Sequence, residues 1–347
     1  MKKFKALFLL CRPWSLTATA VPFMFFFFSL FIAPFLKVGV SCGDAYLNIT
    51  LAFIAACALQ IACNLLNTWG DNDSGVDNVP NAYVTTPQIM QGYVTSRQVL
   101  LLALFFLSIT VTIGTYLMLG FEDGKINFNW LLFAVGVIGV LGASNYATLL
   151  RFKYHGLGTP FVFFLMGPIF YIGIFACLIP SEFFFDLPMF KKVVILFFIT
   201  FISMPIASLV SVILFGNDMR DRLTDEAAGI KTLATILKPR RTLKMYWILH
   251  IYPYLHWVLT VLLVVGFVYG KNKTEYSLWE DIMFFSACVL PFLALPLTVK
   301  TLKSAAADYR KNPENPYWFG YERASGKIHF IFGFLYSLSM ATLMLLG

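Results

Sequence analysis

Apolar residues occur along this chain in long runs that are separated by short polar segments. The runs match the length of about 20 residues that a helix needs to cross the hydrocarbon core of a bilayer. They cover residues 14–36, 45–66, 99–120, 128–148, 158–180, 192–216, 243–269, 281–300 and 327–346. The pattern predicts an all-α, polytopic membrane protein with about nine transmembrane helices in a bundle.

The composition agrees with this fold class. Of the 347 residues, 59% are hydrophobic and 13% are charged, whereas about a quarter of a soluble domain is charged. The mean hydropathy is +0.75. We therefore expect residues 1–347 to form a single transmembrane domain.

Basic residues gather at the N-terminus and after the even-numbered runs. If the N-terminus is cytoplasmic, all but six of the 26 Lys and Arg residues lie on the cytoplasmic side, as the positive-inside rule requires. This predicts a cytoplasmic N-terminus and an external C-terminus. The bilayer then accounts for the net charge of +8, and no nucleic-acid partner is expected.

The N-terminus MKKFKALFLLC has the outline of a lipoprotein signal peptide, but other features oppose cleavage. Leu10 stands where a small residue should precede Cys11, and a full-length apolar run follows. The six cysteines form no CxxC pair, and five lie in or beside apolar runs. We expect packing roles for them, not disulfides or a zinc site.

A first polar cluster, NLLNTWGDNDSGVDN, occupies residues 64–78 at the end of the second apolar run. Asn67 and Asp71 are four residues apart, so they share one face if the helix continues through them. Asp77 would point away on a regular helix, but Gly75 offers a break that returns it to the same site. Carboxylates at a membrane boundary are costly, so we treat them as functional candidates.

A second cluster repeats this spacing at the end of the sixth run, within residues 207–237. Asn217 and Asp221 are four residues apart, and Asp225 follows after four more. Both clusters follow an even-numbered run and therefore lie at the same side of the membrane. We expect two parallel four-helix repeats with a ninth helix added, and one site shared by the two clusters.

Two carboxylate clusters that face each other are suited to a hard cation. Mg²⁺ takes oxygen ligands and is usually bound by a few carboxylates together with substrate phosphates. Arg220, Arg222 and Lys231 lie beside the second cluster and would meet the remaining phosphate charge. Because the site opens at the bilayer, the expected guest is a lipid diphosphate whose tail lies among the apolar helices.

Four stretches of the chain now resemble one family. They are RPWSLTATAVP (12–22), the first cluster, FKYHGLGTPFVFFLMGP (152–168) and the second cluster with its IKT tail. Together they resemble the UbiA superfamily of intramembrane aromatic prenyltransferases over residues 12–237. The five-residue gap between Asp71 and Asp77 resembles the dihydroxynaphthoate polyprenyltransferase branch, where the ubiquinone branch has three residues.

This resemblance implies a Mg²⁺-dependent transfer of a polyprenyl group from a polyprenyl diphosphate to an aromatic acceptor through an allylic carbocation. The implied acceptor is 1,4-dihydroxy-2-naphthoate, in menaquinone biosynthesis at a bacterial cytoplasmic membrane. The segments 67–98 and 217–242 are expected as loops that form a cytoplasmic cap. The implied metal ligands are Asp71, Asp77, Asp221, Asp225 and Asn67; the implied substrate-binding residues are Asn217, Lys231, Arg220, Lys153, Arg12, Tyr154 and Tyr146.

The chain also departs from the family pattern, which leaves the acceptor open. The family often has Asp where Thr68 stands, an acidic residue where Thr159 stands, and an Arg near residues 85–88. Another acceptor such as 4-hydroxybenzoate therefore stays an alternative. So does a lipid or ion transporter with a carboxylate coupling site, although such sites usually lie at the bilayer midplane. A lipid-linked alcohol phosphotransferase would carry its aspartates in one cluster, not two. The prenyl chain length and the oligomeric state stay open.

Overall fold

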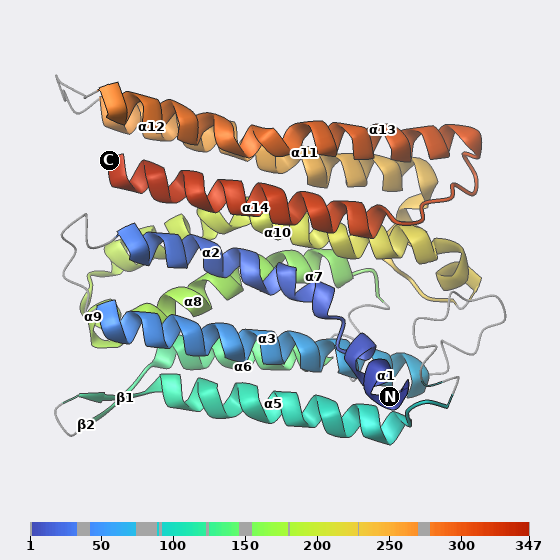
Figure 1. Cartoon of the computed structure of the whole chain (residues 1–347), viewed down its shortest axis with the longest axis horizontal. Coiled ribbons are helices and arrows are strands. Elements are labelled where there is room, and N and C mark those ends of the chain that lie inside the picture. Colours follow the sequence, from blue (N-terminus) through green and yellow to red (C-terminus); the bar gives the residue numbers. More distant parts are fainter. Residues whose placement is uncertain are drawn as a thin grey trace.

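The computed structural model describes residues 2–32, 42–73, 89, 92–122, 125–145, 155–179, 181–227, 229–269 and 278–346. These residues form a bundle of long helices that lie side by side (Figure 1). The first elements are α1 (Lys2–Leu10), the 3-10 turn η1 (Pro13–Ser15), α2 (Leu16–Ile32), α3 (Cys42–Asp73), α5 (Ser96–Met118), the strands β1 (Leu119–Glu122) and β2 (Lys125–Phe128), and α6 (Trp130–Asn145).

The named elements of the second part of the chain are all helices or helical turns. Its elements are α7 (Gly158–Phe164), the π-helical turn η4 (Leu165–Ile169), α8 (Phe170–Leu178), α9 (Ser181–Asp186), α10 (Met189–Ala227), α11 (Leu233–Tyr269), α12 (Leu278–Val289), the 3-10 turn η5 (Leu290–Ala294), α13 (Leu295–Lys311) and α14 (Tyr321–Leu346). The all-α prediction is therefore confirmed, with one small addition: β1 and β2 form an antiparallel hairpin between α5 and α6.

Among the described residues, eight helical stretches are long and apolar enough to cross a membrane. Three of them join shorter helices end to end, namely α1 with α2, α7 with η4 and α8, and α12 with η5 and α13. The predicted run 128–148 forms α6, which is apolar but only 16 residues long. Each of the nine predicted apolar segments thus contains a helix within the described residues, although one of these helices is short.

Both polar clusters begin on helices. Residues 67–73 continue α3, and residues 217–227 continue α10. The prediction that the segments 67–98 and 217–242 are loops is therefore wrong for these residues. The physical reason is packing: Asn and Asp favour turns in isolation, but contacts with neighbouring helices override weak local propensities.

The end of α10 explains the glycine in the tail of the second cluster. Gly229 has a φ of 70°, in the left-handed region that favours glycine. The Gly229 N–H donates to the Glu226 carbonyl at 3.1 Å, and the Ile230 N–H donates to the Asp225 carbonyl at 2.8 Å. This is a Schellman motif, so Gly229 ends α10 after Ala227, two residues beyond Asp225.

Close helix approaches hold α10 at the centre of the bundle. A Cβ added at Gly167 would collide with Ala207 of α10, and one added at Gly216 would lie 2.9 Å from the Glu322 backbone of α14. The C-terminal ends of α3 and α10 and the N-terminal end of α14 lie at the same end of the bundle, at the right of Figure 1. The β-hairpin lies at the opposite end of the bundle.

Candidate functional site

A cavity of about 1530 Å³ opens between α2, α3, α5, α6, α7–α8, α10 and α14. Most of its lining residues are apolar. Its charged lining residues come from the α10 C-terminal end, the α14 N-terminal end and the turn at Arg12. The cavity therefore has a charged end and a long apolar body.

One face of α10 supplies much of the charged end. Apart from Arg220, the α10 residues that line the cavity recur every three or four positions, which places them on one helical face. The apolar stripe begins at Val210 and becomes polar at Asn217. The α10 lining residues are Val210, Ile213, Leu214, Asn217, Asp218, Arg220, Asp221, Thr224 and Asp225.

Arg220 and Asp221 form a bidentate ion pair at the charged end of the cavity. The Arg220 Nε donates to Asp221 Oδ1 at 2.7 Å, and a terminal nitrogen donates to Asp221 Oδ2 at 2.6 Å. The other terminal nitrogen lies 3.4 Å from Glu322 Oε1 on α14. One guanidinium therefore lies between two carboxylates from different helices, and paired geometry of this kind is strong and directional.

Arg222 lies only two residues further along α10 but has a different role. It is buried and donates to the Glu314 carbonyl at 2.9 Å and to Asn315 Oδ1 at 3.1 Å. It also pairs with Glu226 at 3.2 Å. Arg222 thus fastens α10 to the segment between α13 and α14, and it does not line the cavity.

Another wall of the cavity is formed by α3, which presents a polar series that includes Asn67. Gln60, Cys63, Asn64 and Asn67 line the cavity at helical spacing. The Asn67 Nδ2 lies 3.9 Å from the Cys63 sulfur, while its Oδ1 is buried and has no hydrogen-bond partner within the described part of the chain. The α3 helix runs on past Asp71 to Asp73, as the same-face prediction requires.

Arg12 enters the cavity from a tight turn. Its φ of 49° and ψ of 60° are left-handed, a conformation that is unfavourable for a non-glycine residue and is often found at functional sites. Its carbonyl accepts from the Ser15 backbone N–H at 2.8 Å and from the Ser15 hydroxyl at 2.8 Å. Asn64 donates to the Ser15 Oγ at 2.8 Å and to the Cys11 carbonyl at 3.1 Å, so α3 holds the turn.

The structure brings together six of the predicted site residues and leaves Lys231 outside the lining. Lys231 is exposed, and its backbone forms a parallel bridge with His155. The side chain of Asp71 and the whole of Asp77, Tyr146, Lys153 and Tyr154 lie outside the described residues. The predicted residues that line the cavity are Arg12, Asn67, Asn217, Arg220, Asp221 and Asp225.

The sequence interpretation missed four charged lining residues, Asp218, Glu322, Arg323 and Lys327. Asp218 adjoins Asn217 but is not part of the four-residue spacing on which the predicted site was based. The other three lie on α14, after the stretch that resembles the family. The only available signal was an acidic residue at the start of an apolar run, which is also typical of an ordinary helix N-terminus.

Two of the residues that depart from the family pattern are buried. Thr68 and Thr159 are both enclosed, and neither hydroxyl has a hydrogen-bond partner within the described residues. Neither residue lines the cavity. The threonines therefore stand in the protein interior, where a carboxylate would need a compensating charge.

The donor set at the charged end fits a hard divalent cation. Carboxylate and amide oxygens come from Asn217, Asp218, Asp221 and Asp225, and the buried Asn67 Oδ1 faces no donor in the described part of the chain. Oxygen ligands of this kind suit Mg²⁺. Among the described residues, no three acidic, His or Cys side chains converge closely enough to hold a metal alone, so these residues would share a Mg²⁺ with further ligands such as substrate phosphates.

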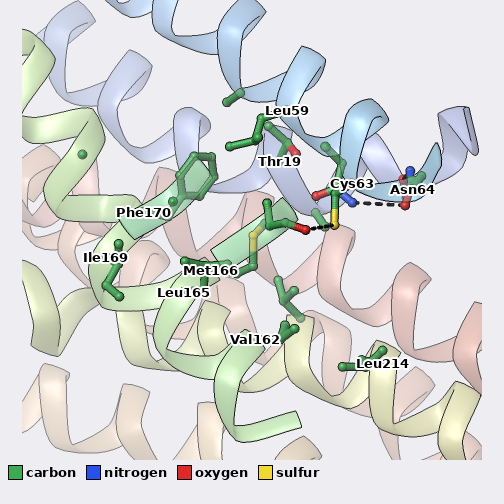
Figure 2. A pocket seen from close by; sticks show the side chains of 18 of the residues that line it. Thr19, Leu59, Cys63, Asn64, Val162, Leu165, Met166, Ile169, Phe170 and Leu214 are labelled. Atoms are coloured by element: carbon green, nitrogen blue, oxygen red, sulfur yellow. Dashed lines mark hydrogen bonds between the residues drawn. The ribbon is translucent and has the colours of Figure 1, made fainter. Parts of the chain in front are cut away.

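The apolar body of the cavity is roomy because glycines line it. A Cβ added at Gly114, Gly136 or Gly139 would meet no atom within 4 Å. Figure 2 shows Leu59 and Cys63 of α3 on one side and Val162, Met166 and Phe170 on the other. A long flexible hydrocarbon chain can therefore extend along α5 and α6 without displacing side chains.

Comparisons with known proteins agree with this site. A model of the UbiA prenyltransferase family matches residues 20–271. The 1,4-dihydroxy-2-naphthoate octaprenyltransferase of Bacillus subtilis (strain 168) is 27% identical over 234 residues, which cover 66% of this chain and 64% of that protein. The UbiA prenyltransferase domain-containing protein 1 of Xenopus tropicalis is 25% identical over 287 residues, which cover 82% and 69%.

A solved structure shows the same fold. A UbiA homolog from Archaeoglobus fulgidus bound to GPP and Mg²⁺ matches with a TM-score of 0.53 and 15% sequence identity, over 96% of this chain and 99% of that one. Because the family model matches more than half of the chain, the chain belongs to the UbiA prenyltransferase family, which confirms the family resemblance; the solved structure agrees with the all-α fold. The chain matches less than two thirds of the length of the Bacillus subtilis relative.

Proposed function

We propose that this protein transfers a polyprenyl group from a polyprenyl diphosphate to an aromatic acceptor, with Mg²⁺ as cofactor. The observation that carries this proposal is the form of the cavity, which joins one charged end to a long apolar body. A prenyl diphosphate has the same form, with a polyanionic head and a hydrocarbon tail. The family and the GPP and Mg²⁺ bound to the Archaeoglobus fulgidus homolog support the same substrate and metal.

In this proposal, Asp221, Asp225 and Asn67, together with Asp71 and Asp77, would hold Mg²⁺, which would supply positive charge to neutralise the leaving diphosphate. Arg220 and Arg12 line the same end and donate to the outer phosphate oxygens. Lys231 and Lys153 add positive charge at the edge of the site. Asn217 orients the leaving group.

The apolar body then protects the reacting carbon. The bond between the allylic carbon and the diphosphate oxygen breaks, and the electron pair leaves with the diphosphate. Water would capture the resulting carbocation, so its exclusion by the cavity walls matters. A ring carbon of the acceptor attacks the cation and then loses its substituent, which is CO₂ in the case of a naphthoate.

We propose 1,4-dihydroxy-2-naphthoate as the acceptor, oriented by Tyr154 and Tyr146, in menaquinone biosynthesis. The support is the named activity of the Bacillus subtilis relative and the five-residue gap between Asp71 and Asp77. We also propose a bacterial cytoplasmic membrane, with the N-terminus and both motifs facing the cytoplasm; the distribution of Lys and Arg along the chain supports this orientation. Labelling of a cysteine placed at Lys238, in a variant without native thiols, tests this orientation; reaction only from outside would reverse it.

The direct test uses purified protein in detergent with Mg²⁺, a series of prenyl diphosphates, and either 1,4-dihydroxy-2-naphthoate or 4-hydroxybenzoate. Mass spectrometry identifies the products. We expect a prenylated naphthoquinol that requires Mg²⁺ and disappears reversibly with EDTA. Product formation only from 4-hydroxybenzoate would correct the acceptor. Absence of product with every pair, or activity retained in EDTA, would overturn the proposed chemistry.

A further inference from the structure

The first turn of α14 carries an unused carboxylate oxygen beside the Arg220–Asp221 pair. Glu322 is buried, with a relative exposure of 8%, and its Oε1 lies 3.4 Å from Arg220 and 3.6 Å from the more exposed Arg323. Its Oε2 is buried and has no hydrogen-bond partner within the described residues. Burying a carboxylate oxygen without a hydrogen-bond donor costs free energy, and this cost needs a physical explanation.

The backbone places Glu322 against α10 with little freedom to move. Gly216 lies one helical turn before Arg220, and a Cβ there would lie 2.9 Å from both the Cα and the backbone nitrogen of Glu322. Behind it, the Tyr321 hydroxyl donates to Asp308 at 2.7 Å, and Tyr246 donates to the Tyr321 carbonyl at 3.3 Å. Several contacts therefore hold the backbone at Glu322 beside Arg220.

The proposed function sets two demands on Asp221 that conflict. As a metal ligand, Asp221 must turn its carboxylate oxygens toward a divalent cation. Both oxygens are engaged by Arg220 in this structure, and two cations cannot share one carboxylate without repulsion. When the metal binds, the guanidinium needs another anion close by.

We propose that Glu322 is a positioning residue that receives the Arg220 guanidinium when a divalent cation takes Asp221. The exchange keeps Arg220 at the charged end of the cavity, where it then faces the diphosphate. This inference rests on the proposed function, because it assumes that Asp221 binds the metal. It also assigns a role in the site to α14, which lies beyond the region matched by the family model.

The test measures cation binding without turnover. Mn²⁺ replaces Mg²⁺, and electron paramagnetic resonance reports free and bound Mn²⁺ with the purified full-length chain in detergent. Glu322→Gln keeps the size of the side chain but removes its charge. We expect it to weaken Mn²⁺ binding about tenfold, because Arg220 loses the attraction of the Glu322 carboxylate and competes more strongly for Asp221.

A double-mutant cycle separates this exchange from a general loss of negative charge. Arg220→Gln alone should tighten Mn²⁺ binding, because it removes the competitor. In the Arg220→Gln background, Glu322→Gln should then have little further effect. Plain electrostatics predicts instead that Glu322→Gln costs the same in both backgrounds, and that result would overturn the proposal.

Two further variants test whether the effect belongs to this carboxylate. Glu322→Asp restores the charge and should recover most of the affinity for Mn²⁺. Glu226→Gln removes a carboxylate that pairs with Arg222 outside the cavity and should leave Mn²⁺ binding unchanged. If Glu322→Gln does not yield folded protein, Arg220→Gln decides alone, since it leaves α14 intact: weaker or unchanged Mn²⁺ binding contradicts the exchange.

The readouts also separate this inference from the proposed function. Prenyl transfer by the wild type together with an additive cycle rejects the role of Glu322 and leaves the function standing. A coupled cycle without prenyl transfer supports the exchange and rejects the function. Absence of Mn²⁺ binding by the wild type, both alone and with inorganic diphosphate supplying the phosphate ligands, rejects both.

Discussion

The charged end and the apolar body of the cavity are built in opposite ways. At the charged end, α10 and α14 approach so closely that Gly216 has no room for a Cβ, and Arg220 and Arg222 are each held by several partners. In the apolar body, Gly114, Gly136 and Gly139 leave open space. The charged end holds charges in fixed places, whereas the apolar body has room for a long hydrocarbon chain.

This difference follows from what each region would bind. Ion pairs and metal ligands lose most of their strength when they are displaced by small distances, so the helices that carry them must be fixed. Contacts with a hydrocarbon chain are non-directional and scale with buried area, so approximate walls are enough. Substitutions at the charged end should therefore affect the rate, and substitutions in the body should change which substrate is used.

The largest effect is expected for Asp225. Asp225→Asn keeps the shape of the side chain but removes a charge that would hold Mg²⁺ against the diphosphate, so kcat/KM should fall by about a thousandfold, the upper part of the range for losing one preorganised electrostatic group. Steady-state kinetics with the prenyl diphosphate varied gives the number. The neighbouring Glu226→Gln is the matched control, because Glu226 pairs with Arg222 outside the cavity. Equal losses for the two variants would show that the charged end has been placed wrongly.

The next effect concerns the apolar body. Gly139→Phe should fill the space along α6 and raise KM for long prenyl diphosphates by about 10- to 100-fold, while short ones react almost normally, because hydrophobic pockets discriminate by about that much per excluded group. Competition between short and long diphosphates, read by mass spectrometry, measures the shift. Gly266→Phe is the control, since Gly266 also has open space around it but does not line the cavity. A uniform loss for all chain lengths would count against a tail in this region.

The sequence predicts these two regions to different extents. Long apolar runs predict the spans because only helices of this length satisfy their backbone in a bilayer. The four-residue spacing of Asn217, Asp221 and Asp225 predicts that they share one face of α10, and the structure confirms this. Spacing does not say which of Arg220 and Arg222 faces the cavity, because that depends on the neighbours of the helix.

The sequence pattern did not predict that α14 contributes charged residues to the cavity. Glu322 pairs with Arg220 across about a hundred residues of chain, and nothing local distinguishes it from an ordinary acidic residue in the first turn of a helix. The glycine lining of the body was equally hidden, because a glycine can serve close packing, as at Gly216, or open space, as at Gly139. Only the packed structure separates the two.

A smaller effect is expected at that close approach. Gly216→Ala would press on the Glu322 backbone and should lower the free energy of unfolding by about 1–3 kcal/mol, the usual cost of overpacking. Thermal and denaturant unfolding in detergent would show it. Gly266→Ala should be neutral or slightly stabilising, since an alanine in a helix interior is favoured over glycine by about 0.5–1 kcal/mol. If both variants behave alike, the α10–α14 contact is looser than the structure has it.

The smallest effect is expected at Lys231, which the sequence placed in the diphosphate site. Its side chain is exposed and does not line the cavity, and an exposed charge contributes only about 0.2–1 kcal/mol because water and salt screen it. Lys231→Met should therefore raise KM for the prenyl diphosphate by no more than about fivefold, and the increase should shrink as salt is added. Arg220→Met removes a charge inside the cavity and should cost much more, with little dependence on salt. Kinetics of both variants at low and high salt decides between them: a Lys231 effect as large as that of Arg220, and unmoved by salt, would mean that the end of α10 closes over the diphosphate when substrate binds.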